Sequence, residues 1–157
     1  MRTEFPEEWE WHIEPVYDGL VPDTRFSNGL AAVSRNGKYG YIDREGRVAI
    51  EFLYDRAYEF SEGLARVERN GKIGYIDRQG QVVIPFQYDK GGDFSEGYVW
   101  IFDGEAYGFA NRQGDVVIPP QYEYAYDFKE GVAPVKSSGK YGYINPNGET
   151  VIAFRFD

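Results

Sequence analysis

Residues 36–46 read NGKYGYIDREG, and residues 70–80 read NGKIGYIDRQG. The second stretch repeats the first 34 positions further along the chain, with two letters changed. The same step relates five columns of identical residues in four copies, without an insertion. The columns are Phe26, Phe60, Phe94 and Phe128; Gly29, Gly63, Gly97 and Gly131; Gly40, Gly74, Gly108 and Gly142; Gly46, Gly80, Gly114 and Gly148; Ile50, Ile84, Ile118 and Ile152. This pattern predicts tandem units that bury a hydrophobic core by stacking on one another.

Each repeat predicts three short strands joined by tight turns. In the first strand, the inward apolar residues, such as Ala31 and Val33, recur at every second position, which is the period of a half-buried strand. Asn36-Gly37 predicts a two-residue hairpin, because both central residues of a type I′ turn need positive φ. The third strand holds Pro85 in the second copy and Pro119 in the third. Since proline cannot donate to a ladder, these positions predict an edge strand or a bulge.

A second turn follows the second strand of every repeat. It begins with Asp or Asn and has Gly in its fourth place, which is the pattern of a type I turn. The fourth-place glycines are predicted to be structural, with positive φ. They are Gly46, Gly80, Gly114 and Gly148.

The period-two patterns and regular turn signals predict a single all-β domain over residues 1–157. We expect a cap and extra strand at 1–18, followed by repeats at about 19–52, 53–86, 87–120 and 121–157. Residues 13–18, IEPVYD, resemble the third-strand ending IPFQYD at 84–89. A third-strand segment therefore stands near each end, which favours an open stack or superhelix of three-stranded antiparallel units. A propeller-like ring is the alternative.

The bulk composition limits the partners. The net charge is −9, so phosphate backbones and anionic membrane surfaces should repel the chain, and we expect neither nucleic-acid nor membrane binding. The absence of cysteine excludes disulfides and thiolate chemistry. The N-terminal residues MRTEFPEEWEW lack the apolar core of a signal peptide, so we expect a cytoplasmic protein.

The recurring pattern G-K-[aromatic]-G-Y-I-D, then V-I-P and a link with F-x-E-G, resembles the bacterial WG repeat, also called the KWG repeat. The resemblance covers about residues 13–157. The tryptophan that names the family is replaced by Tyr39, Ile73, Tyr107 and Tyr141, while the glycine after it stays in all four copies. The resemblance implies a tandem β-rich fold that serves as an interaction scaffold, and it implies no common catalytic residues.

The residues predict no catalytic, metal or cofactor site, so we expect a non-enzymatic protein. His12 is the one histidine, and no motif places it beside a nucleophile. Acids recur once per repeat, which suits turn capping better than paired-carboxylate catalysis or calcium binding, because an active site is normally built once. These acids are Asp43, Asp77, Asp55, Asp89, Glu123 and Asp157.

Two aromatic columns have two readings. One column holds Tyr41, Tyr75, Phe109 and Tyr143, and the other holds Tyr54, Tyr88, Tyr122 and Phe156. They could form a stacking ladder for sugars, or they could pack between the repeats. We favour packing, because the small aliphatic residues of the unit leave rings to fill much of the core.

The third copy departs from its sisters at Trp100 and Phe102. Residues two apart in a strand share a face, and the sister copies keep small or polar residues on this face. The pair is therefore a candidate partner-binding site, since an exposed Trp is a typical interface anchor. Alternatively, the N-terminal segment, with Phe5, Trp9 and Trp11, covers the two rings.

These features lead to two hypotheses of different classes. The first is a non-enzymatic module that binds a protein partner, and the acidic charge favours a basic one, such as a toxin that the module neutralises. The alternative is a carbohydrate or cell-wall binding module that uses the repeated aromatics.

Overall fold

The computed structural model describes residues 26–157, in which fifteen strands form four antiparallel sheets. Sheet 1 contains β1 (Ala31–Arg35), β2 (Lys38–Ile42) and β3 (Val48–Tyr54). Sheet 2 contains β4 (Arg56–Ser61), β5 (Leu64–Arg69), β6 (Lys72–Asp77) and β7 (Val82–Tyr88). Sheet 3 contains β8 (Lys90–Gly91), β9 (Tyr98–Phe102), β10 (Tyr107–Asn111) and β11 (Val116–Tyr122). Sheet 4 contains β12 (Tyr124–Ala125), β13 (Ala133–Ser137), β14 (Lys140–Ile144) and β15 (Thr150–Phe156). The predicted all-β class is confirmed.

Sheets 2 to 4 have one strand more than the three that the sequence predicts. The added strand is β4, β8 or β12, and it lies in the segment that the sequence reading treats as a link. A single residue, Asp55, Asp89 or Glu123, separates it from the last strand of the preceding sheet. Because the chain passes from one sheet to the next through one residue, consecutive sheets lie directly against each other.

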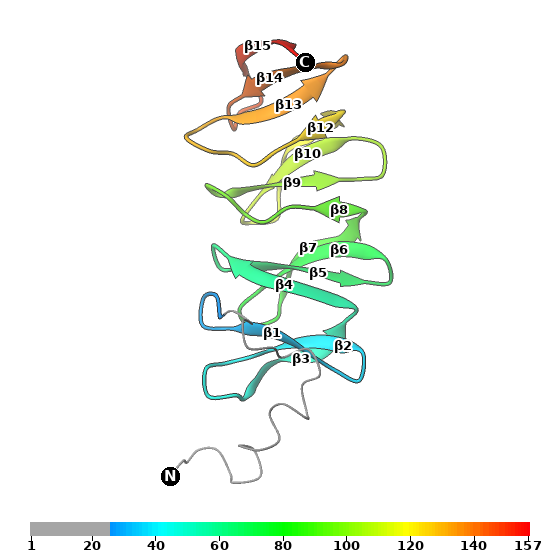
Figure 1. Cartoon of the computed structure of the whole chain (residues 1–157), viewed down its shortest axis with the longest axis vertical. Coiled ribbons are helices and arrows are strands. Elements are labelled where there is room, and N and C mark those ends of the chain that lie inside the picture. The colour runs from blue at the N-terminus through cyan, green and yellow to red at the C-terminus, as the bar shows by residue number, and fades with distance from the viewer. Residues whose placement is uncertain (1–25) are drawn as a thin grey trace.

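The sheets form an open stack, with sheet 1 and sheet 4 at its opposite ends (Figure 1). This arrangement confirms the first choice between a stack and a ring. The predicted cap at residues 1–18 and its extra strand at 13–18 lie outside the described residues.

The turns follow the local rules read from the sequence. In the first hairpin, φ is 55° at Asn36 and 83° at Gly37, as a type I′ turn requires. The third repeat instead uses a wider turn, closed by a hydrogen bond from the Asp103 N–H to the Ala106 carbonyl at 3.2 Å. At the second turn, the four fourth-place glycines have φ values of 82°, 84°, 91° and 82°, in the order Gly46, Gly80, Gly114 and Gly148.

The prolines lie where a missing N–H donor is tolerated. Pro85 and Pro119 fall in β7 and β11, which are edge strands of sheets 2 and 3. Both strands shift register against their neighbours, as a bulge does. The predicted edge or bulge position is confirmed for both.

The core lies between the sheets, because each sheet inserts a ring into the next one. Tyr41 meets Phe60 edge-to-face at 4.9 Å between ring centroids, and Tyr75 meets Phe94 at 5.5 Å in the same way. The Tyr75 hydroxyl also donates to the Gly92 carbonyl at 2.6 Å. The buried phenol thus keeps a hydrogen bond while its ring fills the interface. A single unit has no partner for these rings, which explains why the chain repeats the motif.

Hydrogen bonds outside the core also join consecutive sheets. The Glu62 carboxylate accepts the N–H groups of Glu96 and Gly97 at 2.7 and 2.8 Å. One unit later, the Glu96 carboxylate accepts those of Glu130 and Gly131 at 2.6 and 2.9 Å. The link glutamates therefore form a ladder in which each one caps the turn of the next unit.

Candidate functional site: an aromatic face at the junction of sheets 3 and 4

Trp100 and Phe102 share one face of β9, as their spacing predicts. Val99 and Ile101 alternate with them and are buried, whereas Trp100 and Phe102 are half-buried. Both rings pack on Tyr107, with ring centroids 5.4 and 4.6 Å from it. The two side chains thus contact sheet 3 itself, while the alternative cover, residues 1–12, lies outside the described residues.

The rings continue into sheet 4. Tyr107 meets Tyr124 at 4.8 Å, Tyr124 meets Tyr126 at 4.9 Å, and Tyr126 lies 6.2 Å from Tyr141. We call this continuous set the aromatic face, and it consists of Trp100, Phe102, Tyr107, Tyr124, Tyr126 and Tyr141. Tyr124 and Tyr126 are 37% and 46% exposed, so the face is open to solvent at the start of sheet 4.

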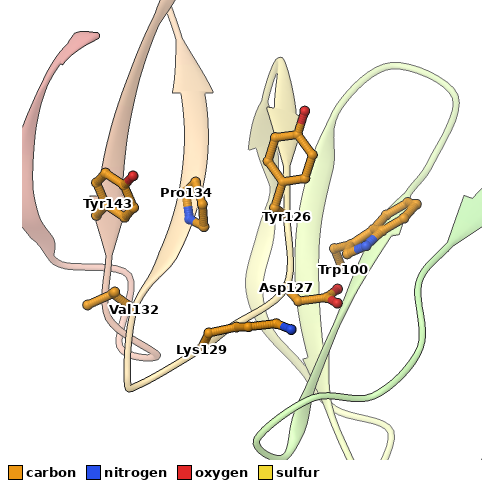
Figure 2. Close-up of a pocket in the computed structure, with 7 residues that line it drawn as sticks. All are labelled: Trp100, Tyr126, Asp127, Lys129, Val132, Pro134 and Tyr143. Carbon is orange, nitrogen blue, oxygen red and sulfur yellow. The ribbon is translucent and has the colours of Figure 1, made fainter.

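A pocket of about 480 Å³ opens beside this face (Figure 2). Trp100 and Asp127 line one side of it, while Pro134 and Tyr143 come from the strands of sheet 4. Tyr126 projects between the two sides. The remaining lining residues are Lys129 and Val132. The pocket therefore combines three aromatic rings with one carboxylate and one ammonium group.

Asp127 supplies the carboxyl group of the pocket, and its pKa is shifted by its surroundings. Burial raises the pKa of its carboxyl above the usual value, and the like charge of Asp93 acts in the same direction. The ammonium of Lys129 and the indole N–H of Trp100 lower this pKa. Figure 2 shows the indole nitrogen turned toward the carboxylate. The site thus holds a partly desolvated carboxyl group whose charged form a cation or a donor stabilises.

Sequence reasoning finds only part of this site. It finds Trp100 and Phe102 from their departure from the sister copies, but it overlooks Tyr124 and Tyr126, which lie in the segment read as a link. The sequence does mark these two rings as unusual, because the residues 34 positions before Tyr124 and Tyr126 are Lys90 and Gly92. Only the last copy places two rings there.

The periodic acids have structural partners. Asp43 Oδ1 accepts the N–H groups of Glu45 and Arg47, both at 2.9 Å, and so caps its turn. At the corner between sheets, Asp55 accepts the N–H of Asn70 at 2.8 Å and pairs with Lys38. Within residues 26–157, no group of three or more His, Asp or Glu side chains is placed to hold a metal ion. His12 lies outside the described residues.

The repeated aromatic columns pack mainly in the core. The buried members are Tyr41, Tyr75, Phe109, Tyr54, Tyr88 and Tyr122. Tyr143, in contrast, lines the pocket, and Phe156 is exposed on the last strand of the stack. These columns therefore do not form a regular ladder of solvent-facing rings with one ring per unit.

Several solved structures are similar to the chain at low sequence identity. A loop-replaced variant of Hsv2 from Kluyveromyces lactis matches with a TM-score of 0.51 and 7% identity, over 81% of this chain and 49% of that one. The extracellular domain of a putative hybrid two-component system from B. thetaiotaomicron matches with a TM-score of 0.48 and 16% identity, over 89% of this chain and 22% of that one. The chain thus spans about half of the first structure and under a quarter of the second.

No curated protein matches the chain. No helix among residues 26–157 is long and apolar enough to cross a membrane. A family model described as the WG containing repeat matches five consecutive segments, at residues 10–39, 39–72, 73–104, 107–141 and 141–157. These segments cover nearly the whole chain, in agreement with the motifs, the turn glycines and the stacked sheets. The chain therefore belongs to the WG-containing repeat family.

Proposed function

We propose that the chain is a non-enzymatic protein-binding module whose partner docks on the aromatic face. The observation that carries the proposal is the pair of exposed rings, Tyr124 and Tyr126, beside a pocket that also contains Trp100. Aromatic side chains that border a partly desolvated pocket are typical binding hot spots. In this proposal the module acts in the cytoplasm, without a cofactor and without nucleic-acid or membrane binding.

The charge supports a basic partner. With a net charge of −9, the chain attracts positively charged surfaces and speeds their association at low salt. Neutralisation of a basic toxin is one role that such a module could fill. A partner of this kind should bind more slowly as salt is added, because screening weakens long-range steering.

The test begins with the products of the neighbouring genes as candidate partners, purified and measured by calorimetry. The variant Tyr124→Lys with Tyr126→Gly installs the residues that the chain itself uses at Lys90 and Gly92. It should weaken binding by about 2 kcal/mol or more, the size of a hot spot, while the melting temperature stays close to that of the wild type. The matched control is Leu53→Gln, because Leu53 is an exposed apolar residue of β3 whose counterpart is Gln87. Equal losses of binding in both variants, or no loss in either, would show that the aromatic face is not the docking surface.

A carbohydrate ligand is the second candidate, and one observation favours it. The rings of Trp100, Tyr126 and Tyr143 line a single pocket together with a carboxylate, which is a composition that suits a sugar. A glycan array decides between the two ligands. Binding of a glycan that is lost in Tyr126→Gly would support this candidate, and an empty array would reject it.

A further inference from the structure

The junctions between successive sheets are built from equivalent positions, so each can be compared with the others. Tyr126 stands 68 positions after Tyr58 and 34 after Gly92. Pro134 stands in the same relation to Arg66 and Trp100. The chain therefore presents three versions of one small site, and two of them are filled by its own side chains.

In sheet 2 the occupant is an arginine. The guanidinium of Arg66 lies 3.9 Å from the centroid of the Tyr58 ring. It donates from Nη1 to the Gly91 carbonyl at 2.6 Å, and its Nη2 lies 3.6 Å from Asp93 Oδ1. Arg66 thus combines stacking on a ring with a carboxylate contact, the two interactions that the planar guanidinium favours.

In sheet 3 the occupant is an indole. Trp100 takes the place of Arg66, and Gly92 takes the place of Tyr58. A Cβ at Gly92 would lie 2.3 Å from Trp100 Nε1, so the indole fills the space that the missing ring leaves. Trp100 also turns its N–H toward Asp127, the counterpart of Asp93. In sheet 3, Trp100 therefore occupies the space of the missing ring and also contacts the acid.

In sheet 4 the aromatic ring returns but its occupant does not. Tyr126 corresponds to Tyr58, yet Pro134 stands where Arg66 would reach over that ring. The result is the pocket of about 480 Å³, bounded by Tyr126, Pro134 and Asp127. The charged groups that face Asp127 are Lys129 and Asp93, one cation and one anion. Lys129 therefore does not give the pocket an excess of positive charge.

We propose that this pocket takes the guanidinium of an arginine side chain of the partner, stacked on Tyr126 and paired with Asp127. The inference rests on the proposed function, because it names the chemical group by which a basic protein is held. Arg66 on Tyr58 within the same chain is the template for the stacking alone. The acid that Arg66 meets, Asp93, follows Tyr58 by 35 positions, whereas Asp127 directly follows Tyr126.

The direct test titrates N-acetyl-arginine methylamide into the full chain and follows the indole N–H of Trp100 and the amide of Tyr126 by NMR. Saturable shifts at both groups are expected. The citrulline analogue has the same shape without the charge, and it should bind about tenfold more weakly or worse. Equal binding of the two compounds, or no shift at either group, would overturn the proposal.

Two variants fix the sign of the charge that the pocket prefers. Lys129→Ser installs the residue found at Ser27, Ser61 and Ser95, and it should tighten arginine binding about fivefold by removing a like charge. Asp127→Asn should weaken arginine binding. Weaker binding in Lys129→Ser would mean that the pocket prefers an anion, and a neutral sugar that displaces the probe would point to the carbohydrate function instead.

A third variant lets the chain fill its own pocket. Pro134→Arg restores the residue of sheet 2 and should place a guanidinium over Tyr126, which raises the melting temperature and abolishes binding of the probe. Pro134→Met is the matched control, because it restores length without charge and should not raise the melting temperature. If both variants behave alike, the pocket has no preference for a guanidinium.

The outcomes separate this inference from the proposed function. A partner that binds through Tyr124 and Tyr126 while the arginine probe does not bind would reject the inference and leave the function standing. A probe that binds while the partner does not use the aromatic face would reject the proposed function and leave only the affinity of the pocket for a guanidinium.

Discussion

Gly80 and Gly114 show that the cost of replacing a turn glycine depends on the atoms around it. They hold the same turn position in successive sheets, with φ values of 84° and 91°. A Cβ at Gly80 would meet the Ile50 side chain at 3.4 Å, whereas a Cβ at Gly114 would lie 2.3 Å from the Val83 carbonyl oxygen. The first contact can relax by a small side-chain shift, but the second needs movement of the backbone of another sheet.

We therefore predict that the two alanine variants differ in stability. Gly80→Ala should lower the free energy of unfolding by about 1 kcal/mol, the cost of a left-handed residue with a side chain. Gly114→Ala should cost at least about 1 kcal/mol more, because strain is added to the φ penalty. Chemical denaturation measures both. Equal costs would mean that sheets 2 and 3 separate easily enough to absorb the clash.

The raised pKa of Asp127 predicts a pH dependence of stability. The folded state favours the protonated carboxyl, so the stability linked to this group is fully present below its unfolded pKa and is lost as pH rises through its folded pKa. Between about pH 3 and pH 7, the melting temperature of the wild type should therefore fall relative to that of Asp127→Asn. Thermal unfolding at a series of pH values tests this, and a gap that widens in favour of the wild type as pH rises would contradict it.

At the residue scale, the sequence predicts the features that depend only on residues close together in the chain. The turn glycines and the capping by Asp43 depend on a few neighbouring residues, so their patterns are sufficient. The environment of Asp127 depends on Trp100 and Asp93 of the preceding unit, which meet it only after the sheets stack. No local pattern contains that information, and so the pocket could not be predicted.

At the element scale, the second strand explains which family residue can change. The named tryptophan is replaced by Tyr39 in the first copy, yet Gly40 after it is kept. A Cβ at Gly40 would lie 2.5 Å from the Ile50 carbonyl oxygen, and one at Gly108 would lie 2.4 Å from that of Ile118. The third strand crosses so close that only glycine fits, whereas the preceding ring has room to vary.

The first strands of sheets 3 and 4 were not predicted, and the reason is their length. β8 and β12 have two residues each, which is too short for a period-two pattern to be seen. Their strand character comes from pairing with β9 and β13. β4 has six residues and was missed too, because its burial does not follow a period of two.

The glutamate ladder gives a prediction about the elements that join the sheets. Glu96 caps the turn of sheet 4 through two N–H groups, whereas Glu130, its counterpart one unit later, has no such partner within residues 26–157. Glu96→Ala should lower the free energy of unfolding by about 1 kcal/mol, the usual net value of such hydrogen bonds at an exposed site. Glu130→Ala is the matched control and should change it little. If the two variants lose the same stability, the ladder does not hold the sheets together.

At the scale of the whole molecule, the stack has two unlike kinds of unit, because inner sheets are covered on both sides and sheet 4 is covered on one. The column isoleucines show the difference. Ile84 of β7 is 1% exposed under sheet 3, whereas Ile152 of β15 is 37% exposed. In stacked repeats, stability is a sum of unit terms and interface terms, so a unit that lacks one interface is the weaker one.

This asymmetry predicts different responses to the same substitution. Ile84→Ala should destabilise the protein by about 3 kcal/mol, because it opens a cavity between two sheets. Ile152→Ala removes a side chain that is already partly solvated and should cost about 1 kcal/mol or less. Chemical denaturation measures both, and hydrogen exchange adds a local readout, since the amides of β14 and β15 should exchange before those of β6. Equal costs for the two variants, together with uniform exchange along the stack, would show that something else, such as a second copy of the chain, covers sheet 4 in solution.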